Sequence, residues 1–264
     1  MHRPTSRARR AGGAVVTPPA FPPTGRGGAI VLVHGAWVGE WCWEPVLPLI
    51  RRSGRAVHAV SLRGHGVRAR ESGPHITLDD HVDDLVDLVD TFDLDEVTLV
   101  GHSYGGRVVT RAWPRVADRV DRLVYLDAHA PLGEAAIERA TGHLVERDGM
   151  VPFDRFTPDP AEFGGADAVD WFTSRLRPQS AATLSADFAV DLPTDVDTTY
   201  VAATKDADSP FAGYAAAARA SCDWRFGELD CSHWLMIARP VEVARIVLDP
   251  TTLPLTHPTS GDPR

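Results

Sequence analysis

The feature that most constrains the fold of this chain is a repeated alternation of short apolar runs with amphipathic stretches. The apolar runs are rich in β-branched residues and bounded by turn residues, which is typical of strands buried in a parallel sheet. They cover residues 29–33, 56–62, 96–100, 123–126, 199–203 and, more weakly, 223–227. Helical periodicity fills residues 43–52, 77–92, 104–117, 211–220 and 240–248. We therefore predict a doubly wound α/β fold with a mostly parallel sheet of about six strands and helices on both faces.

The length of 264 residues suits one domain, which we expect over residues 28–250. The strand pattern lapses over residues 131–192, where short amphipathic pieces such as 134–146 alternate with Pro, Asp, Phe and Gly. Because a loop this long rarely lacks structure of its own, we predict a helical cap inserted over the strand ends. Ligands of such sheets bind outside the carboxyl ends of the strands, so we look for function there.

Composition excludes several classes of function and partner. A formal net charge of −9 argues against nucleic-acid binding, and no apolar run approaches the roughly 20 residues that cross a membrane. Cys42, Cys222 and Cys231 show neither disulfide nor zinc-site spacing, so we expect a cytoplasmic protein without a metal. Residues 1–27 and 251–264 are expected to be flexible tails. The expected partner is a small-molecule substrate, and a homodimer is kept open.

The sequence VTLVGHSYGG carries the strongest chemical signal. It places Gly101-His102-Ser103-Tyr104-Gly105 directly after a predicted strand and before a predicted helix, which is the context of a nucleophile elbow. The tight turn leaves no room for side chains at the two glycines and presents the serine at a helix N-terminus. A chance match would leave Ser103 as a helix cap, but the flanking strand and helix favour a catalytic nucleophile.

A serine hydroxyl needs a base, and eleven histidines compete for this role. For this type of elbow the acid and then the histidine follow the serine along the chain, and the histidine lies after the last strand. His233 meets that condition. His129 follows a strand that ends near Asp127, so it is a candidate for lining the pocket.

The third member of a triad is a carboxylate that orients the histidine. Asp206, just beyond the predicted strand 199–203, is the first choice. Asp208 lies two residues farther along the same loop, and Asp127 ends the preceding strand. Both remain alternatives.

Acyl transfer also needs two N–H donors that face the developing oxyanion. The Tyr104 amide is one candidate, and the Ala36 amide in the segment His34-Gly35-Ala36-Trp37 is the other. Trp37, together with His129 and Trp234, is expected to contact substrate.

The segments VLVHGAW, RGHG, GHSYGG, YVAATKD and CSHWLM together resemble the α/β-hydrolase superfamily. The resemblance is strongest to a compact branch with plant methylesterases, hydroxynitrile lyases and bacterial relatives. It implies a triad of Ser103, Asp206 and His233, with an oxyanion hole from Ala36 and Tyr104. Hydroxynitrile lyases of this branch carry a lysine directly after the catalytic histidine. Trp234 stands there in this chain, so cyanohydrin cleavage is not expected.

The predicted function is hydrolysis of an ester, lactone or thioester of a small, largely apolar molecule through an acyl-enzyme, with no cofactor. One alternative is lyase, elimination or acyl-transfer chemistry on a natural-product intermediate, because one site of this kind hosts several chemistries. A third reading is a small-molecule receptor on a hydrolase fold.

Overall fold

The computed structural model describes residues 28–132, 145–153, 156–188, 190, 192, 196–206 and 208–253. The tail predicted at the N-terminus lies outside these residues, as does most of the tail predicted over residues 251–264. So does most of the first predicted cap helix, residues 134–146. The end of the described chain forms a short 3-10 turn, η4 (Pro250–Thr252).

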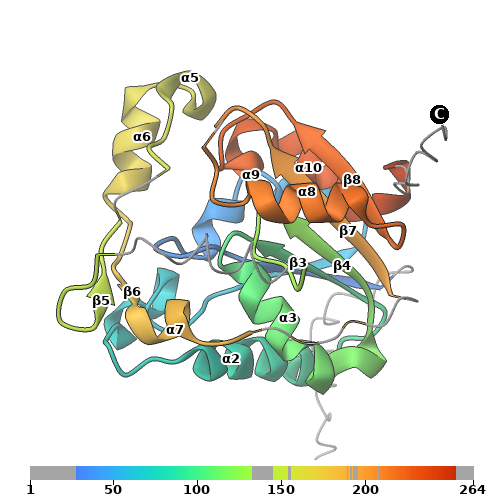
Figure 1. The fold of residues 1–264 in the computed structure, drawn as a ribbon, viewed down its shortest axis with the longest axis horizontal. Helices are drawn as coiled ribbons and strands as arrows, with labels where there is room; N and C mark the ends of the chain where they lie inside the picture. Colours follow the sequence, from blue (N-terminus) through green and yellow to red (C-terminus); the bar gives the residue numbers. More distant parts are fainter. Residues whose placement is uncertain are drawn as a thin grey trace, which may run out of the picture.

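A parallel sheet of six strands confirms the predicted fold class (Figure 1). Its spatial order is β2-β1-β3-β4-β7-β8, and all neighbouring pairs are parallel. The strands are β1 (Ala29–Val33), β2 (Ala56–Val60), β3 (Val97–His102), β4 (Val120–Leu126), β7 (Asp197–Ala203) and β8 (Trp224–Leu229). The chain winds outward from β1 to β2 and then in the opposite direction from β3, so the switch point lies between β1 and β3. A crevice opens at the carboxyl ends of strands at such a point.

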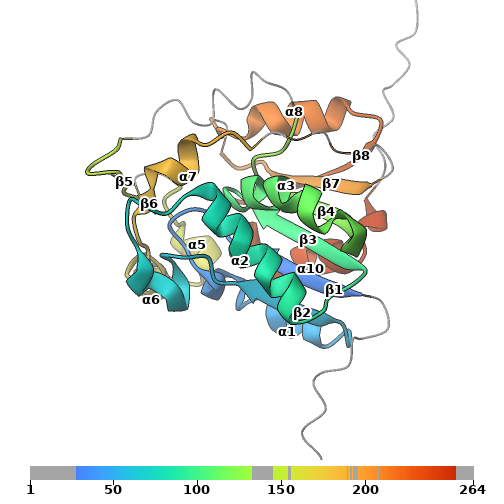
Figure 2. The ribbon, with the colours of Figure 1, turned by 90° about the horizontal axis from the view of Figure 1, so that it is seen from below.

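Alternate residues of each central strand supply two separate cores. In β1, Val31 and Val33 pack beneath α2 (Leu78–Thr91), α3 (Gly105–Val116) and α8 (Ala212–Ala220), whereas Ile30 and Leu32 belong to the opposite core. The opposite face is covered by α1 (Leu47–Arg51), α9 (Leu235–Ala238) and α10 (Pro240–Leu248), of which α1 and α10 are labelled in Figure 2. Strands buried on both faces have no polar face, which is why the sequence showed unbroken apolar runs.

Two details of the helices follow from local sequence. Thr77 caps α2, because its side chain accepts a hydrogen bond from the Asp80 amide while the Asp80 carboxylate accepts one from the Thr77 amide. The helix predicted over 43–52 is wrong at its start. A 3-10 turn, η1 (Glu40–Trp43), comes first, and α1 begins at Leu47 because Pro48 is tolerated only in the first helical turn.

The described part of the predicted cap holds more than helices. The strands β5 (Met150–Val151) and β6 (Gln179–Ser180) form a small antiparallel sheet. The helices there are α5 (Pro160–Phe163), α6 (Ala166–Thr173) and α7 (Ala181–Ser185). In Figure 1, α5 and α6 stand to one side of the main sheet. The remaining short turns are η2 (Gly66–Glu71) and η3 (Ala117–Arg119).

Gly105 gives a direct test of how closely α3 packs on β1. A β-carbon at this position would lie 2.5 Å from the Val33 carbonyl oxygen, and main chain cannot move aside as a side chain can. We expect Gly105→Ala to lower the free energy of unfolding by about 3 kcal/mol in urea denaturation. Gly54→Ala is the control, since its β-carbon would meet nothing within 4 Å and it carries only a left-handed backbone cost of about 1 kcal/mol. Equal losses in both variants would contradict the close packing.

Candidate active site

The candidate nucleophile lies in a strained turn between β3 and α3. Ser103 has a φ of 54°, which a residue with a side chain rarely adopts. Main-chain hydrogen bonds hold the turn: the Ser103 amide donates to the Leu126 carbonyl at 3.2 Å, and its carbonyl accepts from the His129 amide at 3.2 Å. A β-carbon at Gly101 would come within 2.8 Å of the backbone of Gly105. The glycines are therefore required by packing, as predicted for an elbow.

The loop after β1 runs directly past the candidate nucleophile. A β-carbon at Gly35 would lie 3.0 Å from the Ser103 β-carbon, closer than ordinary van der Waals contact, so glycine lets the loop pass next to the serine. His34 fastens this loop, because its Nε2 accepts a hydrogen bond from the Leu62 amide at 3.3 Å. The loop is therefore held between the segment that follows β2 and the turn that follows β3.

The two amides predicted for an oxyanion hole are both available. Within the described part of the chain, neither the Ala36 amide nor the Tyr104 amide donates a hydrogen bond to a protein acceptor. The Tyr104 amide lies at the N-terminus of α3, where the helix dipole favours negative charge. The Tyr104 side chain points elsewhere, since its hydroxyl bonds to His81 Nδ1 at 2.8 Å.

The candidate base pairs with a carboxylate in the protein interior. His233 follows β8, and its Nδ1 lies 2.6 Å from Asp127 Oδ2, with side-chain exposures of 2% and 3%. A carboxylate accepts hydrogen bonds, so Nδ1 carries the proton and Nε2 is left as the basic nitrogen. Asp127 directly follows β4, has a φ of 41°, and its Oδ1 also accepts from the Ala203 amide at 3.4 Å.

Aromatic side chains surround the imidazole and exclude water from it. The ring of Phe156, from the cap, stacks on His233 with centroids 3.9 Å apart, and Phe211 stacks at 5.1 Å. Burial lowers the pKa of His233, because the charged imidazolium would lose its hydration, while the Asp206 carboxylate has a smaller opposing effect on this pKa. Burial raises the pKa of Asp127, but the Nδ1–H of His233 donates to its carboxylate at 2.6 Å and so favours the ionised form. His233 is therefore kept neutral, as a general base must be.

His102 joins the elbow to the loop that carries the candidate base. Its Nε2 donates to the His233 carbonyl at 2.9 Å, and the two rings lie 4.6 Å apart. Among the described residues, no hydrogen bond connects the Ser103 hydroxyl directly with His233. Such contacts often tighten only when substrate is bound.

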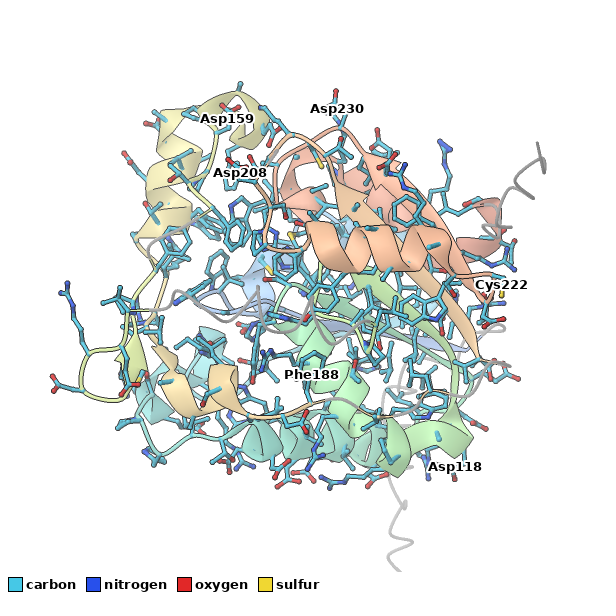
Figure 3. All side chains as sticks on the ribbon, in the orientation of Figure 1. Asp118, Asp159, Phe188, Asp208, Cys222 and Asp230 are labelled. Atoms are coloured by element: carbon cyan, nitrogen blue, oxygen red, sulfur yellow. The ribbon has the colours of Figure 1, made fainter. Side chains whose placement is uncertain are left out.

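The carboxylate that contacts His233 is not the first choice made from sequence. Asp206 is exposed on the loop after β7, and Asp208 lies exposed on the same loop (Figure 3), whereas Asp127 bonds to His233. Chain order favoured Asp206, but spatial order decides the contact. β4 lies between β3 and β7 in the sheet, so the residue that directly follows β4 points into the centre of the site.

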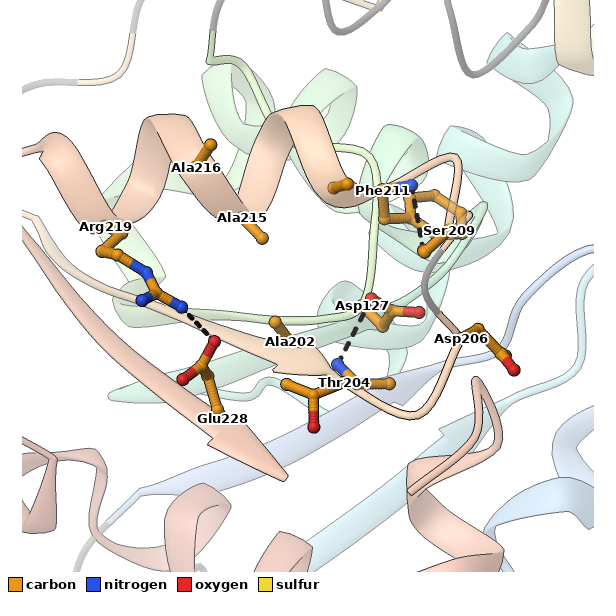
Figure 4. A pocket seen from close by; sticks show the side chains of 12 residues that line it. Asp127, Ala202, Thr204, Asp206, Ser209, Phe211, Ala215, Ala216, Arg219 and Glu228 are labelled. Atoms are coloured by element: carbon orange, nitrogen blue, oxygen red, sulfur yellow. Dashed lines mark hydrogen bonds and ion pairs between the residues drawn. The ribbon is translucent and has the colours of Figure 1, made fainter. Parts of the chain in front are cut away.

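A groove borders this acid on the side of α8 (Figure 4). Its volume is about 390 Å³, and Asp127 and Asp206 line it together with apolar residues of β7 and α8. An ion pair of Arg219 and Glu228 closes one end. Neither Ser103 nor His233 lines this groove, which adjoins the candidate site at Asp127.

The three expected substrate contacts are all buried and hydrogen-bonded within the protein. The indole nitrogen of Trp37 donates to the Val151 carbonyl at 2.9 Å. The indole of Trp234 donates to the Phe156 carbonyl at 2.7 Å. His129 Nδ1 bonds to the Tyr214 hydroxyl at 3.1 Å. Trp37 and Trp234 thus hydrogen-bond to the cap, and the ring of His129 lies edge-on to that of Phe188 in the cap.

Two cap residues near the site were not predicted from the sequence. Phe156 and Gln179 lie on short segments without helical or strand periodicity, so no pattern singled them out. The only signal was the aromatic content of the cap region, which does not specify which ring contacts His233.

Within the described ranges, no group of three or more His, Cys, Asp or Glu residues could hold a metal ion. No helix of the described chain is long and apolar enough to cross a bilayer.

Comparisons with known proteins agree with this fold. The carbendazim hydrolyzing esterase of Nocardioides sp. (strain SG-4G) is 32% identical over 231 residues, which cover 81% of this chain and 96% of that protein. Methylesterase 8 of Arabidopsis thaliana is 36% identical over 102 residues, 38% of each chain. The crystal structure of an Arabidopsis methylesterase superposes with a TM-score of 0.68 at 22% identity and covers 85% of this chain and 98% of that one. A family model described as "Alpha/beta hydrolase family" matches residues 30–246. The resemblance to methylesterases and bacterial relatives is thereby confirmed, and the chain belongs to the alpha/beta hydrolase family.

Proposed function

We propose that this protein is a serine hydrolase that cleaves an ester, lactone or thioester of a small, largely apolar molecule through an acyl-enzyme. The observation that carries the proposal is the buried pair of His233 and Asp127 next to the strained turn at Ser103. The esterase and methylesterase relatives support the same chemistry.

The proposed reaction begins when His233 Nε2 takes the hydroxyl proton of Ser103 and Oγ attacks the carbonyl carbon. The amides of Ala36 and Tyr104 bind the oxyanion that forms. The imidazolium, stabilised by the Asp127 carboxylate, gives its proton to the leaving alcohol or thiol. Water then attacks the acyl-enzyme with His233 again as base, which releases the acid and restores Ser103.

We propose Asp127 as the acid of the triad, with Asp206 as a more distant charge. The 2.6 Å contact with Nδ1 and the burial of both groups support this assignment.

For location, we propose the cytoplasm. Two of the three cysteines, Cys42 and Cys231, are buried as thiols, and Cys222 is exposed as a thiol, which suits a reducing compartment.

Modification of Ser103 tests the proposed nucleophile. A fluorophosphonate reagent should label the wild-type enzyme at one site, because it reacts only with an activated serine. Intact mass and peptide mapping should place the label on Ser103, and Ser103→Ala should lose both the label and ester turnover. Exposed Ser185 provides a control, since Ser185→Ala should keep both. Label on another residue, or turnover by Ser103→Ala near the wild-type rate, would exclude the proposed mechanism.

Substitution of the two aspartates tests the proposed acid. Asp127→Asn should lower kcat by about 10³- to 10⁴-fold, because the amide favours the wrong imidazole tautomer. The matched variant Asp206→Asn removes an exposed charge, so we expect a loss of less than about tenfold. Circular dichroism would establish that both variants are folded. The reverse ranking would assign the acid to Asp206.

The pH dependence of kcat/KM tests the state of the base. Catalysis needs neutral His233, and burial lowers its pKa, so activity should persist below the ordinary value of about 6.5 and fall only at more acidic pH. Phe156→Ala should uncover the ring and move this fall to higher pH, towards 6.5. Phe92→Ala, at a half-exposed position on the far end of α2, should not move it. A wild-type midpoint at or above 6.5 would contradict the role of burial.

A further inference from the structure

We infer that Trp37 and Trp234 are positioning residues that fasten the cap to both halves of the active site through their indole N–H groups. We call this pair the indole clamp. The inference rests on the proposed function, because it concerns the alignment of the oxyanion amide of Ala36 and of the base His233. Each tryptophan directly follows one of these two residues in the chain.

Trp37 is held to the cap at three points. Its indole nitrogen donates to the Val151 carbonyl at 2.9 Å, and its own carbonyl accepts from the Arg177 amide at 2.9 Å. Its amide makes a long contact of 3.5 Å with the Gln179 side-chain oxygen. All three partners belong to the region of β5 and β6, so the small sheet of the cap holds the oxyanion loop.

The backbone at Trp37 needs such support. Its φ is 65°, a left-handed conformation that is strained for a residue with a β-carbon. Strained conformations persist only where surrounding contacts enforce them. The Ala36 N–H belongs to the peptide unit directly before the one that joins Ala36 to Trp37. Release of the tryptophan from the cap would therefore let the direction of this N–H change through the backbone dihedrals of Ala36.

Trp234 makes the corresponding contact on the other half of the site. Its indole nitrogen donates to the Phe156 carbonyl at 2.7 Å, and its side chain is fully buried. The ring of the same Phe156 stacks on His233 at 3.9 Å. Phe156 therefore contacts His233 through its ring and Trp234 through its carbonyl oxygen.

Phe153 connects the two contacts. Its ring lies 5.8 Å from the ring of Trp37 in an edge-on arrangement and 6.4 Å from that of Trp234. The two tryptophans are far apart in sequence, one after β1 and one after β8, and the ring of Phe153 in the cap contacts both. Seating of the cap therefore aligns the oxyanion amide and the base together.

Trp43 provides a matched control within the same chain. It is fully buried, like Trp234, and it packs edge-on against His102. Its indole nitrogen has no hydrogen-bond partner among the described residues. Trp43→Phe therefore makes the same change of side chain without breaking an indole hydrogen bond.

The experiment compares Trp37→Phe, Trp234→Phe and Trp43→Phe in the full chain with a p-nitrophenyl ester as substrate. Loss of either clamp hydrogen bond should lower kcat about tenfold, with KM changed by less than about threefold. Trp37→Phe should also weaken binding of a trifluoromethyl ketone, which presents an oxyanion. Trp234→Phe should move the acid limb of the pH profile to higher pH, because Phe156 would cover the imidazole less. Trp43→Phe should match the wild type in all three measurements.

Hydrogen–deuterium exchange of the peptide that contains Val151 gives a readout independent of activity. Exchange should rise in both clamp variants and remain at the wild-type level in Trp43→Phe. Should a phenylalanine variant not fold, β-(3-benzothienyl)alanine replaces the N–H by sulfur at nearly constant ring volume. Faster exchange with unchanged kcat would overturn the positioning role, and clamp variants that match Trp43→Phe would overturn the clamp. Turnover by Ser103→Ala would instead reject the serine mechanism, and the exchange result would still report on the clamp.

Discussion

Between β3 and α3 the main chain reverses through a serine whose φ is 54°, and the surrounding main chain lies so close that Gly101, Gly105 and Gly106 have no room for a β-carbon. The turn exists because β3 lies in the centre of the sheet, with β1 on one side and β4 on the other. Both neighbouring strands support the turn. The loop after β1 passes the serine at Gly35, and the Leu126 carbonyl at the end of β4 accepts a hydrogen bond from the Ser103 amide. The strain of one residue is therefore supported by three strands, and it presents the hydroxyl at the crevice between them.

Burial determines how the proposed base and acid behave. Taking an imidazolium or a carboxylate out of water is costly, so burial alone favours the neutral form of both His233 and Asp127. The 2.6 Å hydrogen bond opposes this effect when a proton reaches the imidazole, because the carboxylate then faces a positive charge. The His233 imidazole is thus neutral before the reaction, and it can accept a proton during the reaction because the Asp127 carboxylate stabilises the imidazolium. The aromatic rings of Phe156 and Phe211 maintain this balance by excluding water.

The main sheet was predictable because its strands are buried on both faces, and such strands appear in the sequence as unbroken apolar runs. The strand Ala29–Val33 and the helix Pro240–Leu248 have the bounds that the pattern gives. Errors arose where a local feature opposed the pattern, as at Pro48, which delays the start of α1. The strands β5 and β6 have two residues each, too few to show any periodicity, so only a helical cap was expected.

The sequence alone determined the candidates Ser103 and His233 and the amides of Ala36 and Tyr104, because each lies in a short segment whose chemistry depends on its immediate neighbours. It could not determine which aspartate approaches His233, since that depends on the order of strands in space. β4 lies between β3 and β7, and this places Asp127 at the imidazole and leaves Asp206 exposed. The same holds for the cap, whose Phe156 reaches His233 from 77 residues earlier in the chain. Short segments of sequence identify the candidate reacting groups. Contacts between segments that are distant in the chain form only when the whole sheet and its cap are assembled.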